Sequence, residues 1–305
     1  MNKDSKSISL DNNTSVANLR PTPRQQMLAR FRLHRGFQFG LFVLITIILM
    51  ALFAPLLAPY DPYAQNLTIR LTDPAWSEKG SWAHVLGTDG LGRDYLSRMI
   101  YGSRIALIIG FSTILISGVV GTILGVTAGY FGGKVDVVIS FVILNRLSLP
   151  LILVALAVVA SVGNSLTIVI VVLGFLLWDR FAVVMRSATM QVRNMEFIAA
   201  AEVLGARTPR ILYKDILPNV TNQLIVVATL EMAHAILLEA TLSFLGLGVQ
   251  PPLPSWGLMV SEASKFMFFK SWMVTIPGSA IFLLVLAINL LGDGVRDVAA
   301  PEVRN

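Results

Sequence analysis

The sequence has no cysteine and few charged residues. Without cysteine, the chain can form no disulfide, no thiol nucleophile and no thiolate metal site. Charged residues are 14% and hydrophobic residues 55% of the 305 positions, and the mean hydropathy is +0.70. An ordinary soluble domain is about 25% charged. A composition this apolar predicts a polytopic membrane protein.

Three catalytic signatures are also missing. The sequence has no Walker-type phosphate loop, so we expect no ATP hydrolysis by this chain. The three histidines form no H-E-x-x-H pair, and there is no G-x-S-x-G elbow. We therefore expect a non-catalytic chain that binds no metal and no cofactor of its own.

The net charge is +6. Nucleic-acid binding is one explanation of a basic chain. The favoured explanation is the excess of lysine and arginine that membrane proteins keep on their cytoplasmic side. No nucleic acid is expected as a partner.

Six apolar stretches are each long enough to cross about 30 Å of hydrocarbon as a helix. Helices are expected because lipid offers no water to satisfy backbone groups. The stretches are 37–58, 105–130, 137–162, 165–184, 220–245 and 272–291. They predict an all-α polytopic membrane protein with six transmembrane helices in a lipid bilayer.

The segments around these stretches define the predicted domain organisation. Lysine and arginine, with Arg180 counted among them, are more numerous on the segments that share a side with the N-terminus, so both termini are predicted to lie inside. The divisions are a disordered, basic cytoplasmic segment 1–36, a first transmembrane helix 37–58, an external loop 59–104, a five-helix core 105–292 with an inner loop 186–219, and a cytoplasmic tail 293–305.

Two features of the spans and outer segments predict packing. Gly121 and Gly125 are four residues apart and would let a neighbouring helix approach closely, although a span that merely tolerates glycine is the alternative. Outer segments 59–104 and 246–257 are rich in proline and glycine, which predicts folded, non-helical loops. Tryptophans at positions 76, 82, 256 and 272 suit the membrane–water boundary.

The inner loop is predicted to form two short helices separated by a sharp turn. Residues 195–204 are helix-prone, and three consecutive alanines give the helix a flat face. Gly205 can end that helix, Thr208-Pro209 can begin the next, and Leu217-Pro218 is predicted to stop it. A docking element for a soluble partner is favoured, and an amphipathic linker resting on lipid headgroups is the alternative.

Four ionisable residues fall inside the predicted spans, namely Arg146, Glu231, His234 and Glu239. Charged groups in a membrane are costly and usually face the interior of a bundle. One interpretation places them on a translocation path or gate. The other is a buried structural pair such as Arg146 with Glu231. Snorkelling of Arg146 to the surface is disfavoured by its depth.

The inner loop resembles the EAA motif of the membrane subunits of binding-protein-dependent ABC importers. The matching residues are Ala200-Ala201, then Gly205, then Ile216-Leu217-Pro218. The resemblance implies the type I ABC importer permease fold and a coupling helix that fits a groove on a cytoplasmic ATPase. The implied coupling residues are Glu196, Ala199, Ala200, Ala201, Glu202, Gly205, Ile216, Leu217 and Pro218.

Further motifs resemble the second permease of the dipeptide, oligopeptide and nickel branch of that family, over about residues 37–300. They are Gly87-Thr-Asp-Gly-Leu-Gly-Arg-Asp94, Ser97-Arg98, Tyr101-Gly-Ser-Arg104, Ala128-Gly-Tyr-Phe-Gly-Gly133 with Asp136, Leu242-Ser-Phe-Leu-Gly-Leu-Gly-Val-Gln-Pro-Pro252, and Ser255-Trp-Gly257. The candidate external residues within them are Gly87, Asp89, Gly92, Arg93, Asp94 and Trp256.

The resemblance implies a subunit of an ATP-driven importer in the bacterial cytoplasmic (inner) membrane. Di- or oligopeptides are the first substrate class, and nickel chelates, opines and oligosaccharides are alternatives. The implied partners are a second, different permease, two ATPase subunits that bind ATP and Mg, and an extracytoplasmic substrate-binding protein.

The chain also departs from the family pattern. Ala199 replaces the leading glutamate of the motif, and Asp215 stands where an apolar residue or histidine is usual. Phe141 and Leu144 stand where the branch often has arginine and aspartate ahead of Pro150, which weakens any substrate inference from that span.

Two other functional classes compete with the importer. A proton-driven secondary transporter could use the acids and histidine of the fifth span, and a scaffold or receptor would move no substrate. The inner docking loop favours the importer, because neither alternative needs one.

Overall fold

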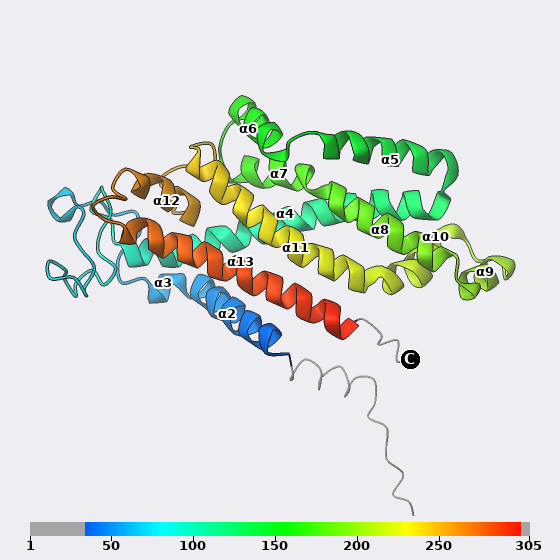
Figure 1. Ribbon diagram of the computed structural model, residues 1–305, viewed down its shortest axis with the longest axis horizontal. Coiled ribbons are helices and arrows are strands. Elements are labelled where there is room, and N and C mark those ends of the chain that lie inside the picture. The colour runs from blue at the N-terminus through cyan, green and yellow to red at the C-terminus, as the bar shows by residue number, and fades with distance from the viewer. Residues whose placement is uncertain (1–33, 300–305) are drawn as a thin grey trace, which may run out of the picture.

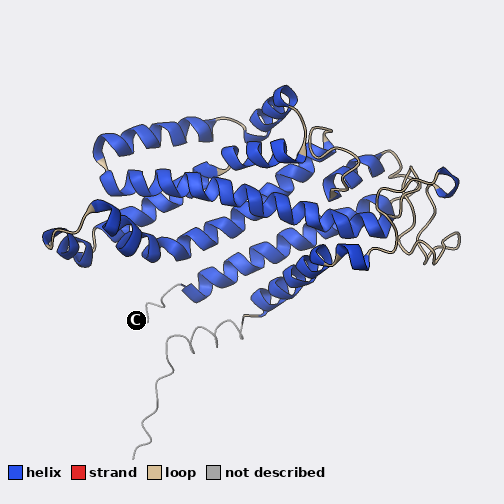
Figure 2. Ribbon diagram, turned by 180° about the vertical axis from the view of Figure 1, so that it is seen from behind, coloured by secondary structure: helices blue, strands red, loops and turns tan. Residues whose placement is uncertain are grey.

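The computed structural model describes residues 34–299, which form a bundle of long helices with no β-strand in that range (Figures 1 and 2). The predicted cytoplasmic segment 1–36 and the end of the predicted tail lie outside the described residues, apart from 34–36 and 293–299. The helices are α2 (Arg35–Leu52), α3 (Ala54–Leu57), α4 (Tyr95–Phe131), α5 (Gly133–Ser148), α6 (Leu151–Val162), α7 (Leu166–Leu176), α8 (Trp178–Arg193), α9 (Glu196–Val203), α10 (Thr208–Arg210), α11 (Leu217–Phe244), α12 (Trp256–Ser264) and α13 (Trp272–Ala299).

Five stretches of helix in the described part are long and apolar enough to cross a membrane, and a sixth span arises when the bent pair α5–α6 is counted as one. This agrees with the six predicted spans. The third span is not straight, because α5 and α6 meet at an angle of 85°. Pro150 lies at that bend, where its ring and missing N–H prevent a continuous helix.

The non-helical part of the first outer segment is shorter than predicted, because the last ten residues of the segment are helical. α4 begins at Tyr95, where the Asp94 side chain accepts a hydrogen bond from the backbone N–H of Ser97 at 2.8 Å and caps the helix. The second outer segment also turns helical, since Ser255 caps α12 in the same way. Capping side chains therefore end both loops.

Glycines on one face of α4 bring its backbone against that of α8. An added Cβ would lie 2.3 Å from the carbonyl oxygen of Trp178 at Gly121, 2.5 Å from that of Ala182 at Gly125, and 2.6 Å from that of Arg186 at Gly129. No side chain fits at such distances. The close helix approach predicted from Gly121 and Gly125 is confirmed, and α8 is the neighbour.

The bundle has two distinct ends. Loops from residues 58–94 gather with α12 at one end, and α9 projects from the other (Figures 1 and 2). The start of α2 lies beside the last turns of α13, where His34 Nε2 is 3.1 Å from Asp297 Oδ2. Both ends of the described part of the chain therefore lie away from the loop end, as the predicted topology requires.

The tryptophans predicted for the membrane–water boundary differ in exposure. Trp256 is buried in the core cluster that joins α4, α11, α12 and α13, and its indole N–H donates to the carbonyl oxygen of Met99 at 2.9 Å. The neighbouring helices cover this side chain, because Gly102 on α4 leaves room for its ring. Trp76 and Trp82 are exposed on the outer loop, as a boundary position requires.

Candidate functional site

The inner loop forms a compact helical hairpin, which we define as residues 194–216. α9 ends in a paired hydrogen-bond arrangement typical of glycine-terminated helices: Gly205 N–H donates to Glu202 O and Ala206 N–H donates to Ala201 O, each at 3.0 Å. Gly205 has φ of +78°, in the left-handed region. The predicted first helix and its glycine stop are confirmed.

The return half of the inner hairpin differs from the prediction. Thr208 and Pro209 begin a helix as expected, but Leu217 and Pro218 do not end it. The chain continues through a π-helical turn (Ile211–Ile216) directly into α11, and Leu217 N–H donates to Leu212 O. The wider turn lies immediately before Pro218, in a position to accommodate a residue that cannot donate the usual helical bond.

Buried isoleucines anchor the inner hairpin to the bundle. Ile198, Ile211 and Ile216 are buried in one cluster with Met185 of α8 and Tyr130 of α4. Ile216 therefore anchors the hairpin and is not part of its exposed surface.

The exposed side of the inner hairpin is formed by other residues. Val203 and Leu204 are each 87% exposed at the tip, and Ala200 and Gly205 are also exposed. Tyr130 OH donates to Glu202 Oε1 at 3.4 Å, which connects the last turn of α9 to α4. The hairpin is thus a rigid projection with an uncovered apolar tip.

A second candidate site lies within the spans, where two helix breaks meet. α5 and α6 are separated at Leu149–Pro150, and α7 and α8 are separated at Leu177. Between them is a cavity of about 310 Å³. It is lined by Arg146, Leu147, Leu149, Pro150, Leu151, Leu177, Asp179, Arg180, Glu231 and His234.

Three of the four predicted intramembrane residues line this mid-span cavity. Glu231 Oε1 lies 3.3 Å from Arg180 Nη1 and 3.4 Å from His234 Nδ1. Arg146 instead donates through Nη2 to the carbonyl oxygen of Leu176, at the end of α7. The pairing of Arg146 with Glu231 considered from the sequence is therefore not formed, because the interrupted helix offers Arg146 a free backbone acceptor.

Glu239 does not share the cavity. It is buried two turns further along α11, and Ser243 Oγ donates to its Oε1 at 2.7 Å. Ser243 Oγ in turn accepts from the backbone N–H of Val249 at 3.0 Å. Glu239 thus helps to fix the loop that follows α11, and it does not line this cavity.

Sequence reasoning missed Asp179 and Arg180 as cavity residues. Arg180 was counted with the inner-side arginines, yet it lies near the middle of the span Leu166–Arg193, which α7 and α8 form together. A signal was present, since Trp178-Asp179-Arg180 interrupts an otherwise apolar run.

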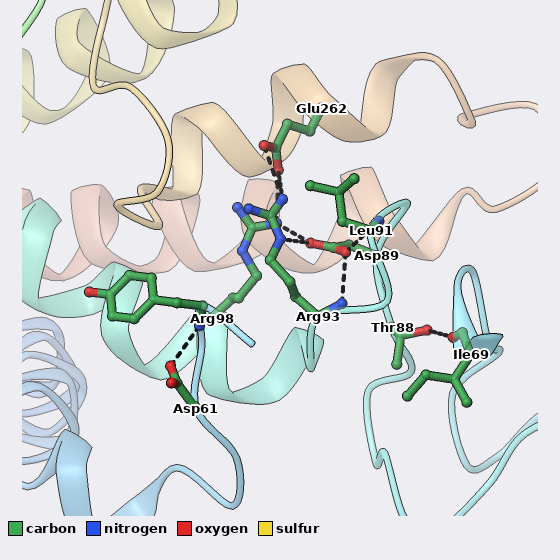
Figure 3. Close-up of polar contacts among 9 residues, drawn as sticks. Asp61, Ile69, Thr88, Asp89, Leu91, Arg93, Arg98 and Glu262 are labelled. Atoms are coloured by element: carbon green, nitrogen blue, oxygen red, sulfur yellow. Dashed lines mark hydrogen bonds and ion pairs between the residues drawn. The ribbon is translucent and has the colours of Figure 1, made fainter. Parts of the chain in front are cut away.

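Two of the predicted outer residues, Asp89 and Arg93, belong to an ionic cluster that joins three segments. The Asp89 carboxylate accepts hydrogen bonds from Arg93 Nε, at 2.6 Å, and from Arg98 Nη1. Both arginines also pair with Glu262 of α12, Arg93 at 3.0 Å and Arg98 at 2.8 Å (Figure 3). We call these four residues the outer ionic cluster. Glu262 was not anticipated, because nothing in the sequence pairs it with a motif more than 160 residues away.

Other residues of the same motif shape its backbone. Gly87 and Gly92 have φ of +76° and +73°, and an added Cβ at Gly92 would lie 1.8 Å from the carbonyl oxygen of Asn66. Asp94 caps α4 and also lies 2.8 Å from His84 Nδ1. The motif is therefore a structural element of the outer end.

Replacing Asp89 with asparagine is expected to destabilise the protein by about 3–5 kcal/mol, because two buried arginines would lose the more buried of the two carboxylates they share. Thermal unfolding of the purified protein in detergent measures this. Glu262→Gln is the matched control and should cost less, since Glu262 is 29% exposed. Equal melting temperatures for Asp89→Asn and the wild type would contradict a stabilising role for this cluster.

Comparison with known proteins adds three kinds of similarity. A family model described as "Binding-protein-dependent transport system inner membrane component" matches residues 121–305, and one described as "N-terminal TM domain of oligopeptide transport permease C" matches residues 22–74. The dipeptide transport system permease protein DppC of Haemophilus influenzae is 41% identical over 283 residues, which are 93% of this chain and 96% of that protein.

Two further similarities are to a permease named for another substrate and to a solved structure. The glutathione transport system permease protein GsiD of Pectobacterium atrosepticum is 39% identical over 285 residues, 93% of each chain. A chain of the MetNI methionine ABC transporter, in an inward-facing conformation, superposes with a TM-score of 0.55 at 19% identity, covering 67% of this chain and 97% of that one. The last similarity concerns the fold alone.

Proposed function

Because this chain belongs to the inner membrane components of binding-protein-dependent transport systems, we propose that it imports di- or short oligopeptides as one half of a two-permease pore. The relatives named for dipeptide and glutathione transport support peptides as the substrate class. No relative cited above favours nickel chelates, opines or oligosaccharides.

The observation that carries this proposal is the position of the inner hairpin between two cavity-lining helices. The hairpin links the end of α8 to the start of α11. Arg180 lies on α8, and Glu231 and His234 lie on α11. A displacement of the rigid hairpin would therefore shift both charged walls of the mid-span cavity together.

The proposed partners follow from this arrangement. Two cytoplasmic ATPase subunits would bind ATP and Mg, and one would receive the exposed face around Ala200, Ala201 and Gly205. A second permease would complete the pore, and an extracytoplasmic binding protein would deliver the peptide. Closing of the ATPases would move the hairpins and switch the pore between its two openings.

Uptake by the reconstituted importer tests the proposal. The chain is purified with its partner permease and ATPases, placed in proteoliposomes with ATP inside, and supplied with binding protein and radiolabelled Ala-Ala. We expect uptake that requires ATP and is unaffected by an uncoupler. If this chain alone takes up Ala-Ala and an uncoupler abolishes that uptake, the result would support a proton-driven transporter instead. If the full assembly takes up no Ala-Ala, the peptide assignment is refuted.

A further inference from the structure

The charges of the mid-span cavity are arranged in two layers. The acids are at the bottom: the Glu231 side chain is 1% exposed, and Asp179 is buried. The basic groups are on top: the Arg180 side chain is 56% exposed and that of His234 is 44% exposed. Glu231 therefore pairs with both bases from beneath, and the exposed side chains of these pairs are the basic ones.

These exposed side chains do not suit a lipid-facing position. Arg180 lies near the middle of its span, where an exposed cation facing hydrocarbon would be costly. Both helix breaks also open on the same cavity, and irregular backbone at membrane depth is tolerated where it lines a cavity or is covered by protein. The cavity therefore suits a face turned toward protein or water rather than toward lipid.

Arg146 has hydrogen-bonding capacity to spare in this cavity. Its Nη2 is used by the carbonyl oxygen of Leu176, while its Nε is buried and has no hydrogen-bond partner. α8 also begins at Trp178, at the cavity wall, so the positive end of its dipole adds to the field. A guanidinium with an unused donor, in a cavity that a second guanidinium also lines, suits a carboxylate.

We propose that this cavity binds the terminal carboxylate of the transported peptide between Arg146 and Arg180, with Glu231 as the positioning residue for Arg180 and His234. This rests on the proposed function, because it takes a peptide as the substrate. The cavity volume of about 310 Å³ is at the lower end of the range of roughly 300–1,000 Å³ for small-molecule sites, which fits a short peptide end. Broken helices at mid-membrane are a recurrent way of building such sites.

Binding measurements on the assembled permeases and ATPases, in lipid nanodiscs without the binding protein, test this proposal. The two probes are Ala-Ala and its C-terminal amide, which lacks the carboxylate. The wild type is expected to bind Ala-Ala saturably and about tenfold more tightly than the amide. Arg146→Gln and Arg180→Gln should each weaken Ala-Ala binding about tenfold and remove the preference for the acid, whereas a purely structural role would weaken both probes equally.

The control variants separate the alternatives. Arg104→Gln, an exposed arginine on the outer turn of α4, should leave the preference unchanged. Arg146→Lys keeps the charge and should retain part of the preference. If Arg146→Gln does not assemble, Arg180→Gln still decides, because its side chain is largely exposed.

Two results would overturn the proposal. The first is that the wild type binds Ala-Ala and its amide with equal affinity, or binds neither. That result is expected if an acidic side chain of the partner permease occupies the cavity. The second is an unchanged preference in both glutamine variants. Either result together with normal Ala-Ala uptake by the complete importer would leave the proposed function intact and remove only the carboxylate site.

Discussion

Replacing Gly125 with leucine is expected to prevent the chain from forming a stable bundle. The first added carbon alone would lie 2.5 Å from the carbonyl oxygen of Ala182 and 2.9 Å from Cβ of Met185. The backbone of α8 cannot yield as a flexible side chain could, so α4 and α8 must separate. Overpacking a core commonly costs about 1–3 kcal/mol, and a leucine at a backbone contact should cost at least about 3 kcal/mol.

A matched variant on the same helix tests the cause of that loss. At Gly118 the nearest atoms to an added Cβ belong to the Phe181 ring, at 3.5 Å or more, which is ordinary contact. Gly118→Ala should therefore accumulate and melt like the wild type, while Gly125→Leu should be recovered in low yield with a lowered melting temperature. Similar melting of the two variants would contradict a close α4–α8 contact.

Replacing Gly205 with valine is expected to reduce peptide uptake at least tenfold while leaving the bundle folded. An added Cβ meets nothing within 4 Å, so no clash arises. The cost is conformational, because φ of +78° is strongly unfavourable for a β-branched residue. The turn after α9 should change shape, and the exposed face of the inner hairpin should no longer fit a partner.

Asparagine is the control at the same position. It adds a side chain but tolerates the left-handed region, so Gly205→Asn should keep most of the uptake. Uptake in proteoliposomes and the melting temperature are measured for both variants. Equal loss in the two would mean that side-chain bulk, not backbone conformation, is responsible, and normal uptake with valine would contradict a coupling role for the turn.

Features with a local or periodic cause could be predicted from the sequence. The length of apolar runs defined the spans, spaced glycines predicted a close helix contact, and Gly205 predicted the end of α9. The family resemblance, drawn from motif order, agrees with the matched family models. Each of these depends on a short stretch of residues and on general backbone or membrane physics.

Features that depend on distant partners could not be predicted. Arg146 bonds a carbonyl that is free only because α7 stops at Leu176. Glu262 joins the outer ionic cluster through the packing of α12 on α4. Pro218 was expected to end a helix, but the preceding π-helical turn allows the helix to continue. In each case the outcome depends on where another segment places its backbone.

Cross-linking from the tip of the inner hairpin tests the central claim most directly, because the chain has no cysteine of its own. Leu204→Cys, at an 87% exposed position, is labelled with a photoreactive maleimide in the assembled importer, and Trp82→Cys, 81% exposed on the outer loop, is the control. Leu204→Cys should give an adduct with an ATPase subunit, and Trp82→Cys should not. An intact assembly in which Leu204→Cys gives no ATPase adduct, or in which Trp82→Cys does, would contradict the account.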